Sequence, residues 1–316
     1  LTHVGFAQDQ EIASNVPGVD VVVGGHSHTL LSNTDEGAAG GYPTMINGVD
    51  GNEVPVVTAY SYGKYLGDLT VTFDAEGNVT SAEGDPILID ASVEPYEEYV
   101  TRLAELEEPL QELMAEVIGT TTAPIEGSRE VCRVEECSMG NLVADAILDA
   151  ASGSGATIAI QNGGGLRASI DEGEITMGEV LTVLPFSNTL ATVEISGADV
   201  IDALENGVSD IENGAGRFPQ VAGLQYSYTL ANPVGERISD VMVDEGGEWV
   251  PIDEDATYTI VTNNYMRGGG DGYGTFAEGD NPYDFGPPLE QVLADYIAAQ
   301  GGEYTPYTDG RITIIE

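Results

Sequence analysis

The stretch VDVVVGGHSHTLL, residues 19–31, runs from an apolar segment through two glycines into two histidines. Such a β-branched run is typical of a buried strand, and Gly24–Gly25 lets the backbone pack tightly before the chain turns out. His26 and His28 follow at once. Side chains just past the carboxyl end of a strand are where α/β folds place their sites. The pattern predicts an α/β fold with functional imidazoles at a strand end.

A third histidine lies close by in the sequence. His3 follows a short apolar start, and residues 8–16 are a helix candidate leading into the strand at 19–25. Two parallel strands joined by that helix would bring His3 beside His26. Imidazole is a good ligand for zinc, manganese, nickel or iron. Since all three histidines of the chain fall at predicted strand ends in one βαβ-sized unit, we expect His3, His26 and His28 to bind metal rather than serve as ordinary surface or core residues.

The rest of the first ninety residues indicates antiparallel strands. Residues 53–90 alternate in polarity, with turn signals at Glu76–Gly77 and Gly84–Asp85. From residue 94 the pattern changes to a near-helical apolar period, with Glu and Gln on the other face and Pro109 expected to kink the helix. With 316 residues the chain is long enough for about two domains. We expect a first domain over 1–92, a connecting helix over 93–118 and a second domain over 119–316.

The second part of the chain alternates helices and strands, which predicts an α/β domain. The helix candidates are 138–152, 176–184, 198–209 and 289–301, and the strand candidates are 156–162, 189–197, 256–266 and 311–315.

The charge of the chain is extreme, with 54 acidic residues against 9 basic ones and a formal net charge of −45. Lys64 is the single lysine. Such a surface repels nucleic acid and anionic membranes, and its self-repulsion eases when salt shortens the screening length. Halophilic adaptation explains the scarcity of lysine better than a merely acidic secreted protein does. No apolar run approaches the roughly 20 residues of a membrane span.

The two cysteines, Cys132 and Cys137, stand five apart in the segment VCRVEEC. Such a pair can close a small disulfide loop in an oxidising compartment. A zinc pair is disfavoured because no second Cys or His pair lies near, and two unrelated buried thiols are the remaining alternative. We favour the disulfide.

Several loop residues carry chemistry suited to a charged, aromatic ligand. Arg133 lies in the cysteine loop and Arg167 follows three glycines; arginine's planar fork suits phosphate oxygens, although each could be a surface ion-pair partner. Phe186 and Tyr265 stand beside turn residues and could sandwich a base or simply pack in a core. Asp271, in GGGDG, could accept from ribose hydroxyls or mark a tight turn.

Taken with their order, these segments resemble a known family. LTHVG followed by GGHSH, and then CRVEECSMGNLVADA, QNGGGLR, VLPFSN and NNYMRGGGDGY, resemble the 5′-nucleotidase family over nearly the whole chain. The resemblance implies the last part of a calcineurin-like metallophosphoesterase ββ-sandwich domain, a connecting helix, and a 5′-nucleotidase C-terminal α/β domain. It implies hydrolysis of nucleoside 5′-monophosphates at two divalent metal ions (Zn, Mn, Mg or Co), with the second domain swinging against the first.

The resemblance also assigns residues one by one. The implied metal ligands are His3, His26 and His28. The implied nucleotide ligands are Arg133 and Arg167 for phosphate, Asn162 for the nucleoside, Phe186 and Tyr265 for the base, and Asp271 for the ribose. The family's Asp-x-His, bridging Asp and Gly-Asn-His motifs precede these segments. We therefore expect an N-terminally truncated member whose catalytic residues lie upstream, inactive alone.

Other functions stay open at this point. A 2′,3′-cyclic phosphodiesterase/3′-nucleotidase or a nucleotide-sugar hydrolase shares both domains and most motifs. A nucleotide-binding protein without catalysis, or a solute-binding or structural surface protein, is a possibility from another class. The cysteine pair and the export common in the family predict a secreted or cell-surface location.

Overall fold

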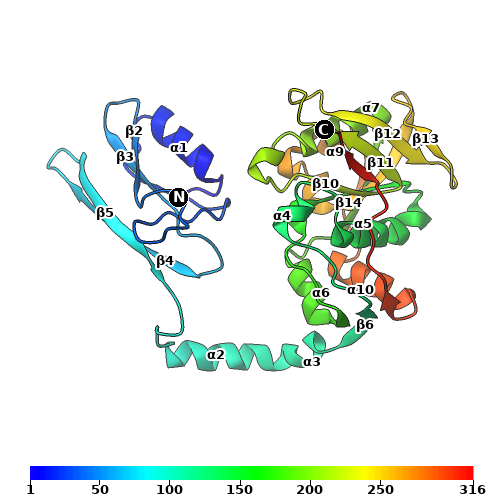
Figure 1. The fold of residues 1–316 in the computed structure, drawn as a ribbon, viewed down its shortest axis with the longest axis horizontal. Helices are drawn as coiled ribbons and strands as arrows, with labels where there is room; N and C mark the ends of the chain where they lie inside the picture. The colour runs from blue at the N-terminus through cyan, green and yellow to red at the C-terminus, as the bar shows by residue number, and fades with distance from the viewer. Residues whose placement is uncertain (316) are drawn as a thin grey trace. The chain divides into compact units, whose positions relative to one another are not determined.

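The computed structural model describes residues 1–315, and its backbone contacts divide the chain into two compact units. The first covers Leu1–Leu103 and the second begins at Ala104. Both mix helices and strands (Figure 1), which confirms the predicted α/β class.

The first unit is built on a three-stranded sheet with helix α1 (Phe6–Asn15) packed against it. The strands are β1 (Val22–Val23), β2 (Thr44–Asn47) and β3 (Glu53–Val57), in the order β1-β3-β2. β1 is parallel to β3, whereas β2 is antiparallel to it. Buried side chains of α1 and the sheet form a small core of Ala13, Val22, Val54 and Val56.

The predicted strand at 19–25 is therefore shorter than expected. Only Val22 and Val23 pair with β3, and the amide of Gly24 extends the ladder by one bond to the carbonyl of Val57 (2.8 Å). The helix predicted at 8–16 is confirmed as α1.

A long antiparallel hairpin completes the first unit, with β4 at Tyr65–Phe73 and β5 at Val79–Leu88. The turn predicted at Glu76–Gly77 is confirmed, because the Asp74 carboxylate accepts the amide of Glu76 (3.0 Å) there. The turn predicted at Gly84–Asp85 is wrong. A Cβ on Gly84 would lie 1.9 Å from the Asp68 carbonyl oxygen, so this glycine allows two strands to approach closely instead of turning the chain.

The connecting helix differs from the prediction at both ends. Helix α2 covers Glu97–Glu107, a 3-10 turn covers Glu108–Leu110, and α3 covers Gln111–Met114. Pro109 lies in the 3-10 turn, as its missing N–H and fixed φ require. The prediction of helix to residue 118 is wrong because the chain becomes strand β6 at Val117–Thr121, which pairs with β8 (Gly173–Thr176).

The second unit is organised around a five-stranded sheet in the order β10-β7-β14-β9-β15. β7 and β14 are parallel, and the other neighbours are antiparallel. These strands cover β7 Ile158–Asn162, β9 Leu190–Ser196, β10 Pro219–Ala222, β14 Thr257–Asn263 and β15 Asp280–Tyr283.

Both faces of this sheet are covered, and alternate residues of its strands enter different cores. Ala159 and Val261 belong to the core shared with one group of helices: α5 (Ser138–Ala151), α6 (Met177–Val183) and α10 (Leu289–Ala299). Ile160 and Ile260 point into the core on the other face. That face packs against α7 (Gly197–Gly207), α9 (Gly274–Glu278) and a second sheet. Figure 1 shows this layering.

Two smaller sheets complete the unit. The second sheet has the order β13-β12-β11-β17 and the third the order β16-β6-β8. Their remaining strands are β11 Leu224–Tyr228, β12 Ile238–Asp244, β13 Trp249–Pro251, β16 Glu303–Tyr304 and β17 Ile312–Ile314.

Local sequence explains where the helices start. Thr176 and Glu179 form a reciprocal capping box on α6, and Ser196 and Asp199 form another on α7. Each box satisfies amides that a helix's first turn leaves without partners. The four helices predicted in the second part of the chain are confirmed, with boundaries shifted by a few residues at most.

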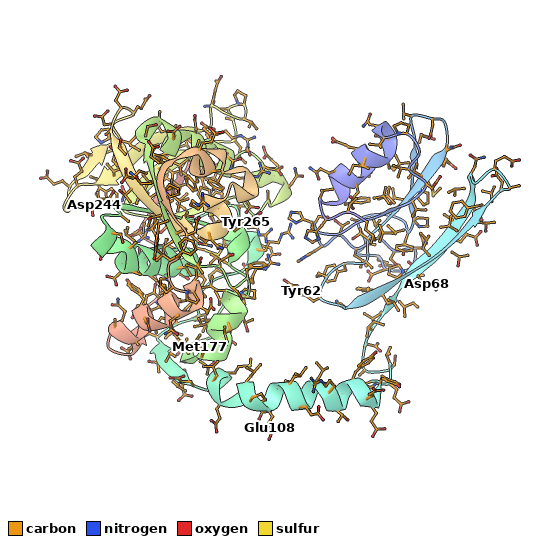
Figure 2. All side chains as sticks on the ribbon, turned by 180° about the vertical axis from the view of Figure 1, so that it is seen from behind. Tyr62, Asp68, Glu108, Met177, Asp244 and Tyr265 are labelled. Carbon is orange, nitrogen blue, oxygen red and sulfur yellow. A yellow bond between two sulfur atoms is a disulfide. The ribbon has the colours of Figure 1, made fainter. Side chains whose placement is uncertain are left out.

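The surface carries the charge that the composition predicts. Asp68 on β4, Glu108 and Asp244 are exposed examples (Figure 2). Within residues 1–315, no helix combines the length and apolar character needed to cross a membrane.

Candidate functional site

In the first unit, two of the three histidines lie together at the end of β1. The ring centroids of His3 and His26 are 5.1 Å apart in an edge-to-face arrangement. A bond from the amide of Thr2 to the carbonyl of Val23 (3.0 Å) holds the start of the chain beside this strand. The ring of His28 lies 5.3 Å from that of Tyr62.

The backbone around these histidines is unusual. His26 has φ 75° and His28 has φ 56°, both in the left-handed region that favours glycine. Such conformations cost on the order of 1–3 kcal/mol each and concentrate at functional sites. Ser27 fixes the turn between them, because its hydroxyl accepts the amide of Phe6 (3.0 Å).

The imidazole nitrogens of His3 and His26, at the end of β1, are donors suited to one side of a metal centre. Imidazole nitrogens suit zinc, manganese and nickel. The glycines allow the close packing: a Cβ on Gly24 would lie 2.0 Å from the buried Asp9 carboxylate, and one on Gly25 would lie 3.1 Å from Nδ1 of His3. Over residues 1–315 the structure contains no group of three or more His, Cys, Asp or Glu side chains arranged to hold a metal ion.

In the second unit, Cys132 and Cys137 are joined by a disulfide with Cα atoms 5.2 Å apart. Cys132 ends the short helix α4 (Arg129–Cys132), and Cys137 caps α5. The loop between them carries Arg133, whose buried guanidinium donates to the carbonyl of Gly214 (3.2 Å).

Gln220, which no local sequence pattern marks, lies under this loop and holds it in place. Its buried amide donates to the carbonyls of Cys132 (3.0 Å) and Glu135 (2.7 Å) and accepts the amide of Cys137 (3.3 Å). Both N–H groups and the oxygen of this buried amide have hydrogen-bond partners, and such a side chain favours one arrangement of its surroundings.

The residues predicted to hold the nucleoside form one hydrogen-bonded group at the ends of β7 and β14. Asn162 donates from Nδ2 to Oδ2 of Asp271 (2.7 Å), and the Tyr265 hydroxyl donates to Oδ1 (2.9 Å). Burial raises the pKa of Tyr265, and the negative charge of Asp271 adds to the shift, because both disfavour the ionised phenolate.

A second set of buried amides fixes the first. Asn263 donates from Nδ2 to the side-chain oxygens of Gln161 and Asn162, at 3.0 Å each. Its own Oδ1 accepts the amide of Met266 (2.9 Å) and so caps α8 (Asn264–Arg267), the helix that carries Tyr265. One amide therefore orients both Asn162 and the helix bearing the aromatic side chain.

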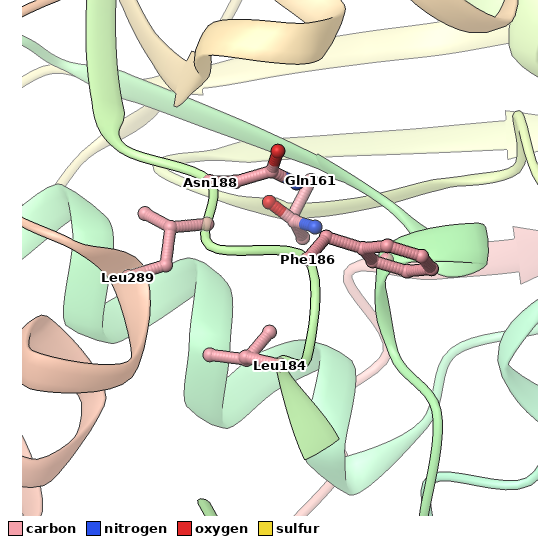
Figure 3. A pocket seen from close by; sticks show the side chains of 6 residues that line it. Gln161, Leu184, Phe186, Asn188 and Leu289 are labelled. Atoms are coloured by element: carbon pink, nitrogen blue, oxygen red, sulfur yellow. The ribbon is translucent and has the colours of Figure 1, made fainter. Parts of the chain in front are cut away.

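Arg167 and Phe186 also meet. The Arg167 guanidinium carbon lies 5.5 Å from the centre of the Phe186 ring, within the range of a cation–π interaction. Both aromatic side chains of the predicted base clamp are open to solvent, with Phe186 54% and Tyr265 47% exposed. Figure 3 shows the small pocket beside Phe186, into which the Gln161 and Asn188 amides project; Leu184 and Leu289 form its apolar wall.

The loop 214–216 links these groups and was missed from the sequence. Gly214 accepts from Arg133 (3.2 Å), and the Gly216 carbonyl accepts the amide of Gly164 (2.7 Å). A Cβ on Gly216 would lie 3.4 Å from Oδ2 of Asp271. The signal for this loop was a Gly-Ala-Gly-Arg segment in a chain with few arginines.

Comparison with known proteins now identifies the family. Residues 117–278 match the family model described as the 5′-nucleotidase, C-terminal domain. The chain belongs to the 5′-nucleotidase family. It is 38% identical to the trifunctional nucleotide phosphoesterase protein YfkN of Bacillus subtilis (strain 168), over 99% of this chain and 21% of that protein. It is 36% identical to the 5′-nucleotidase of Homo sapiens, over 99% of this chain and 57% of that one.

A solved structure agrees with this assignment. The 5′-nucleotidase precursor from Thermus thermophilus superposes with a TM-score of 0.81 at 39% identity, covering 99% of this chain and 62% of that chain. The chain spans 21% of the length of the Bacillus relative, 57% of the human one and 56% of the snake venom 5′-nucleotidase of Gloydius brevicauda. Its relatives are nucleotide phosphoesterases, which places it in a hydrolase family.

Proposed function

We propose that the protein to which this chain belongs hydrolyses nucleoside 5′-monophosphates to nucleoside and phosphate, and that the second unit binds the nucleotide. The observation that carries the proposal is the hydrogen-bonded group of Asn162, Tyr265 and Asp271. It combines a carboxylate for hydroxyl groups with an exposed aromatic face for a base.

The arginines supply the charge complementarity in this proposal. Arg133 and Arg167 would bind the phosphate oxygens through their planar forks. Each has a backbone contact: Arg133 donates to the carbonyl of Gly214 and Arg167 donates to the carbonyl of Gly164, at 3.2 Å each. In a chain of net charge −45 they are a scarce local attraction for an anion.

His3, His26 and His28 would hold divalent metal on the side of the first unit. When bound, two such ions supply a nucleophile from water at neutral pH and stabilise charge on the phosphoryl oxygens. A single catalytic zinc already takes about three protein ligands. We therefore propose that the chain by itself binds nucleotide and turns it over negligibly.

Calorimetric titration of the chain in molar KCl tests the proposal. We expect AMP to bind more tightly than adenosine, and phosphatase activity to stay at background with added Mn²⁺ or Zn²⁺. If neither AMP nor adenosine binds, the proposed nucleotide-binding role is contradicted and a solute-binding or structural protein is favoured. Turnover that disappears in His26→Ala would contradict the inactivity of the isolated chain.

The Bacillus relative is named a trifunctional nucleotide phosphoesterase, which is a reason to test phosphoesters other than nucleoside 5′-monophosphates as substrates. A panel of AMP, 3′-AMP, 2′,3′-cyclic AMP and a nucleotide sugar, assayed on the full-length protein, separates a 5′-nucleotidase from a cyclic phosphodiesterase/3′-nucleotidase or a nucleotide-sugar hydrolase. We expect AMP to have the highest kcat/KM.

The environment of the protein is part of the proposal. The Cys132–Cys137 disulfide suits an oxidising, extracytoplasmic compartment, and the relatives include venom 5′-nucleotidases. The charge of −45 with one lysine suits a halophile. We expect folding to need molar salt, so full folding and solubility in dilute buffer would contradict halophilic adaptation.

A further inference from the structure

The Tyr265 hydroxyl makes two hydrogen bonds to one residue. It donates to Oδ1 of Asp271 (2.9 Å) and accepts the backbone amide of the same Asp271 (3.1 Å). The pair closes a ring between helix α8 and the glycine-rich loop that follows it. A phenylalanine ring could stack on a base equally well, so stacking does not explain the hydroxyl.

The segment that these two bonds hold is rich in glycine. Asp271 has φ 54° and lies between Gly269 (φ 90°) and Gly272 (φ 83°). A Cβ on Gly270 would lie 2.5 Å from the Tyr265 ring, so the ring lies directly against the loop backbone. Glycines leave a chain many alternative conformations. The two bonds from Tyr265 select one of them and fix the direction of the Asp271 carboxylate.

The carboxylate keeps acceptor capacity after these contacts. An ionised carboxylate offers about four lone-pair positions. One oxygen of Asp271 accepts from Tyr265 and the other from Asn162. Each oxygen thus retains one position, and Asp271 is half-buried, so these positions can reach a ligand. Two neighbouring acceptors on one fixed carboxylate match the vicinal 2′,3′-diol of a ribose.

We infer that the Tyr265 hydroxyl determines sugar specificity, by holding Asp271 in the orientation that distinguishes a ribonucleotide from a nucleotide without the diol. This inference rests on the proposed nucleotide-binding function. Preorganisation strengthens binding because the ordering cost is met before the ligand arrives. The opposite role, competition between the hydroxyl and the ribose for Oδ1, predicts tighter ribonucleotide binding when the hydroxyl is removed.

The test compares AMP with 2′,3′-dideoxy-AMP by calorimetry on the full chain in molar KCl. We expect the wild-type chain to prefer AMP by about tenfold or more, since hydrogen bonds to a charged group discriminate strongly. Tyr265→Phe keeps the ring and should reduce that ratio by about three- to tenfold through weaker AMP binding. Its affinity for the dideoxy analogue should change by less than about twofold.

Two controls separate this role from a general structural effect. Tyr283→Phe removes another exposed hydroxyl, which donates to the carbonyl of Phe285 (3.0 Å), and should leave the ratio unchanged. In an Asp271→Asn background, Tyr265→Phe should have little further effect on the ratio, because the two residues act as one unit. Hydrogen exchange at the Asp271 amide should speed up in Tyr265→Phe without any ligand.

The outcomes distinguish the inference from the function on which it rests. If the wild-type chain binds neither nucleotide, the nucleotide-binding function is wrong and the inference falls with it. If the wild-type chain prefers AMP and Tyr265→Phe keeps the same preference, the inference alone is wrong. Tighter AMP binding by Tyr265→Phe would overturn it in favour of competition.

Discussion

Replacing Gln220 with methionine should destabilise the second unit and weaken phosphate binding together. Methionine has a similar length and volume, so the change removes three hydrogen bonds at the disulfide loop with little change in packing. Each lost bond costs about 1 kcal/mol, and more where a buried carbonyl or amide is left without a partner. We expect the free energy of unfolding to fall by about 3–4 kcal/mol.

The single tryptophan makes this measurement specific to the second unit. Trp249 lies in β13, so urea unfolding at fixed molar KCl, followed by its fluorescence, reports that unit alone. Gln225→Met on the neighbouring strand β11 is the matched control, because Gln225 is only half-buried, and it should cost less than about 0.5 kcal/mol. Equal losses in the two variants would refute the role assigned to Gln220. The expected loss of about 3–4 kcal/mol together with unchanged AMP affinity of the folded Gln220→Met chain would also refute it, because Arg133 would then not depend on this support.

Three further predictions concern the same unit. Reducing the Cys132–Cys137 disulfide should lower its stability by about 2 kcal/mol, since the closed loop is short; urea midpoints with and without reductant measure this, and equal midpoints would contradict it. Arg167→Ala should weaken AMP binding by about tenfold or more and adenosine binding far less, and equal losses for both ligands would argue against a phosphate contact. Burial raises the pKa of Tyr228 to about 12. The folded state therefore disfavours the ionised form of Tyr228. The contribution of its protonated hydroxyl to the free energy of unfolding is present below about pH 10 and is lost as the pH rises toward 12. The free energy of unfolding measured from pH 8 to 11 should show this decline, with a smaller slope in Tyr228→Phe.

The sequence predicted the elements whose signals are local. Helix α5 and strand β7 are read directly from apolar periodicity, and Gly163 marks the end of the strand as expected. The errors also have local causes. Gly84 resembles a turn residue because the sequence cannot show the opposite strand, and Val117 continues a helical period while its partner strand β8 lies far along the chain.

The supporting groups of the site depend on contacts between distant residues. Gln220 reaches a loop 88 positions away at Cys132, and Asn263 reaches Asn162 across 101 positions. A single buried Gln or Asn side chain has no periodicity and no characteristic sequence neighbours, so its role cannot be predicted from a sequence pattern. The residues proposed to face a ligand could be singled out from the sequence because they stand in glycine-rich loops at element ends, where binding residues concentrate.

The last strands of the chain have a consequence for synthesis. β16 pairs with β6 at the start of the second unit, with Glu303 opposite Thr120, and β17 lies parallel to β11, with Ile312 opposite Tyr226. A ribosome hides the residues it has just joined, so a nascent second unit lacks an edge of two sheets until residues 303–314 have emerged. Neither sheet can reach its native strand order before these two strands are available. A chain that stopped before Glu303 would leave β6 and β11 open to pairing with other chains.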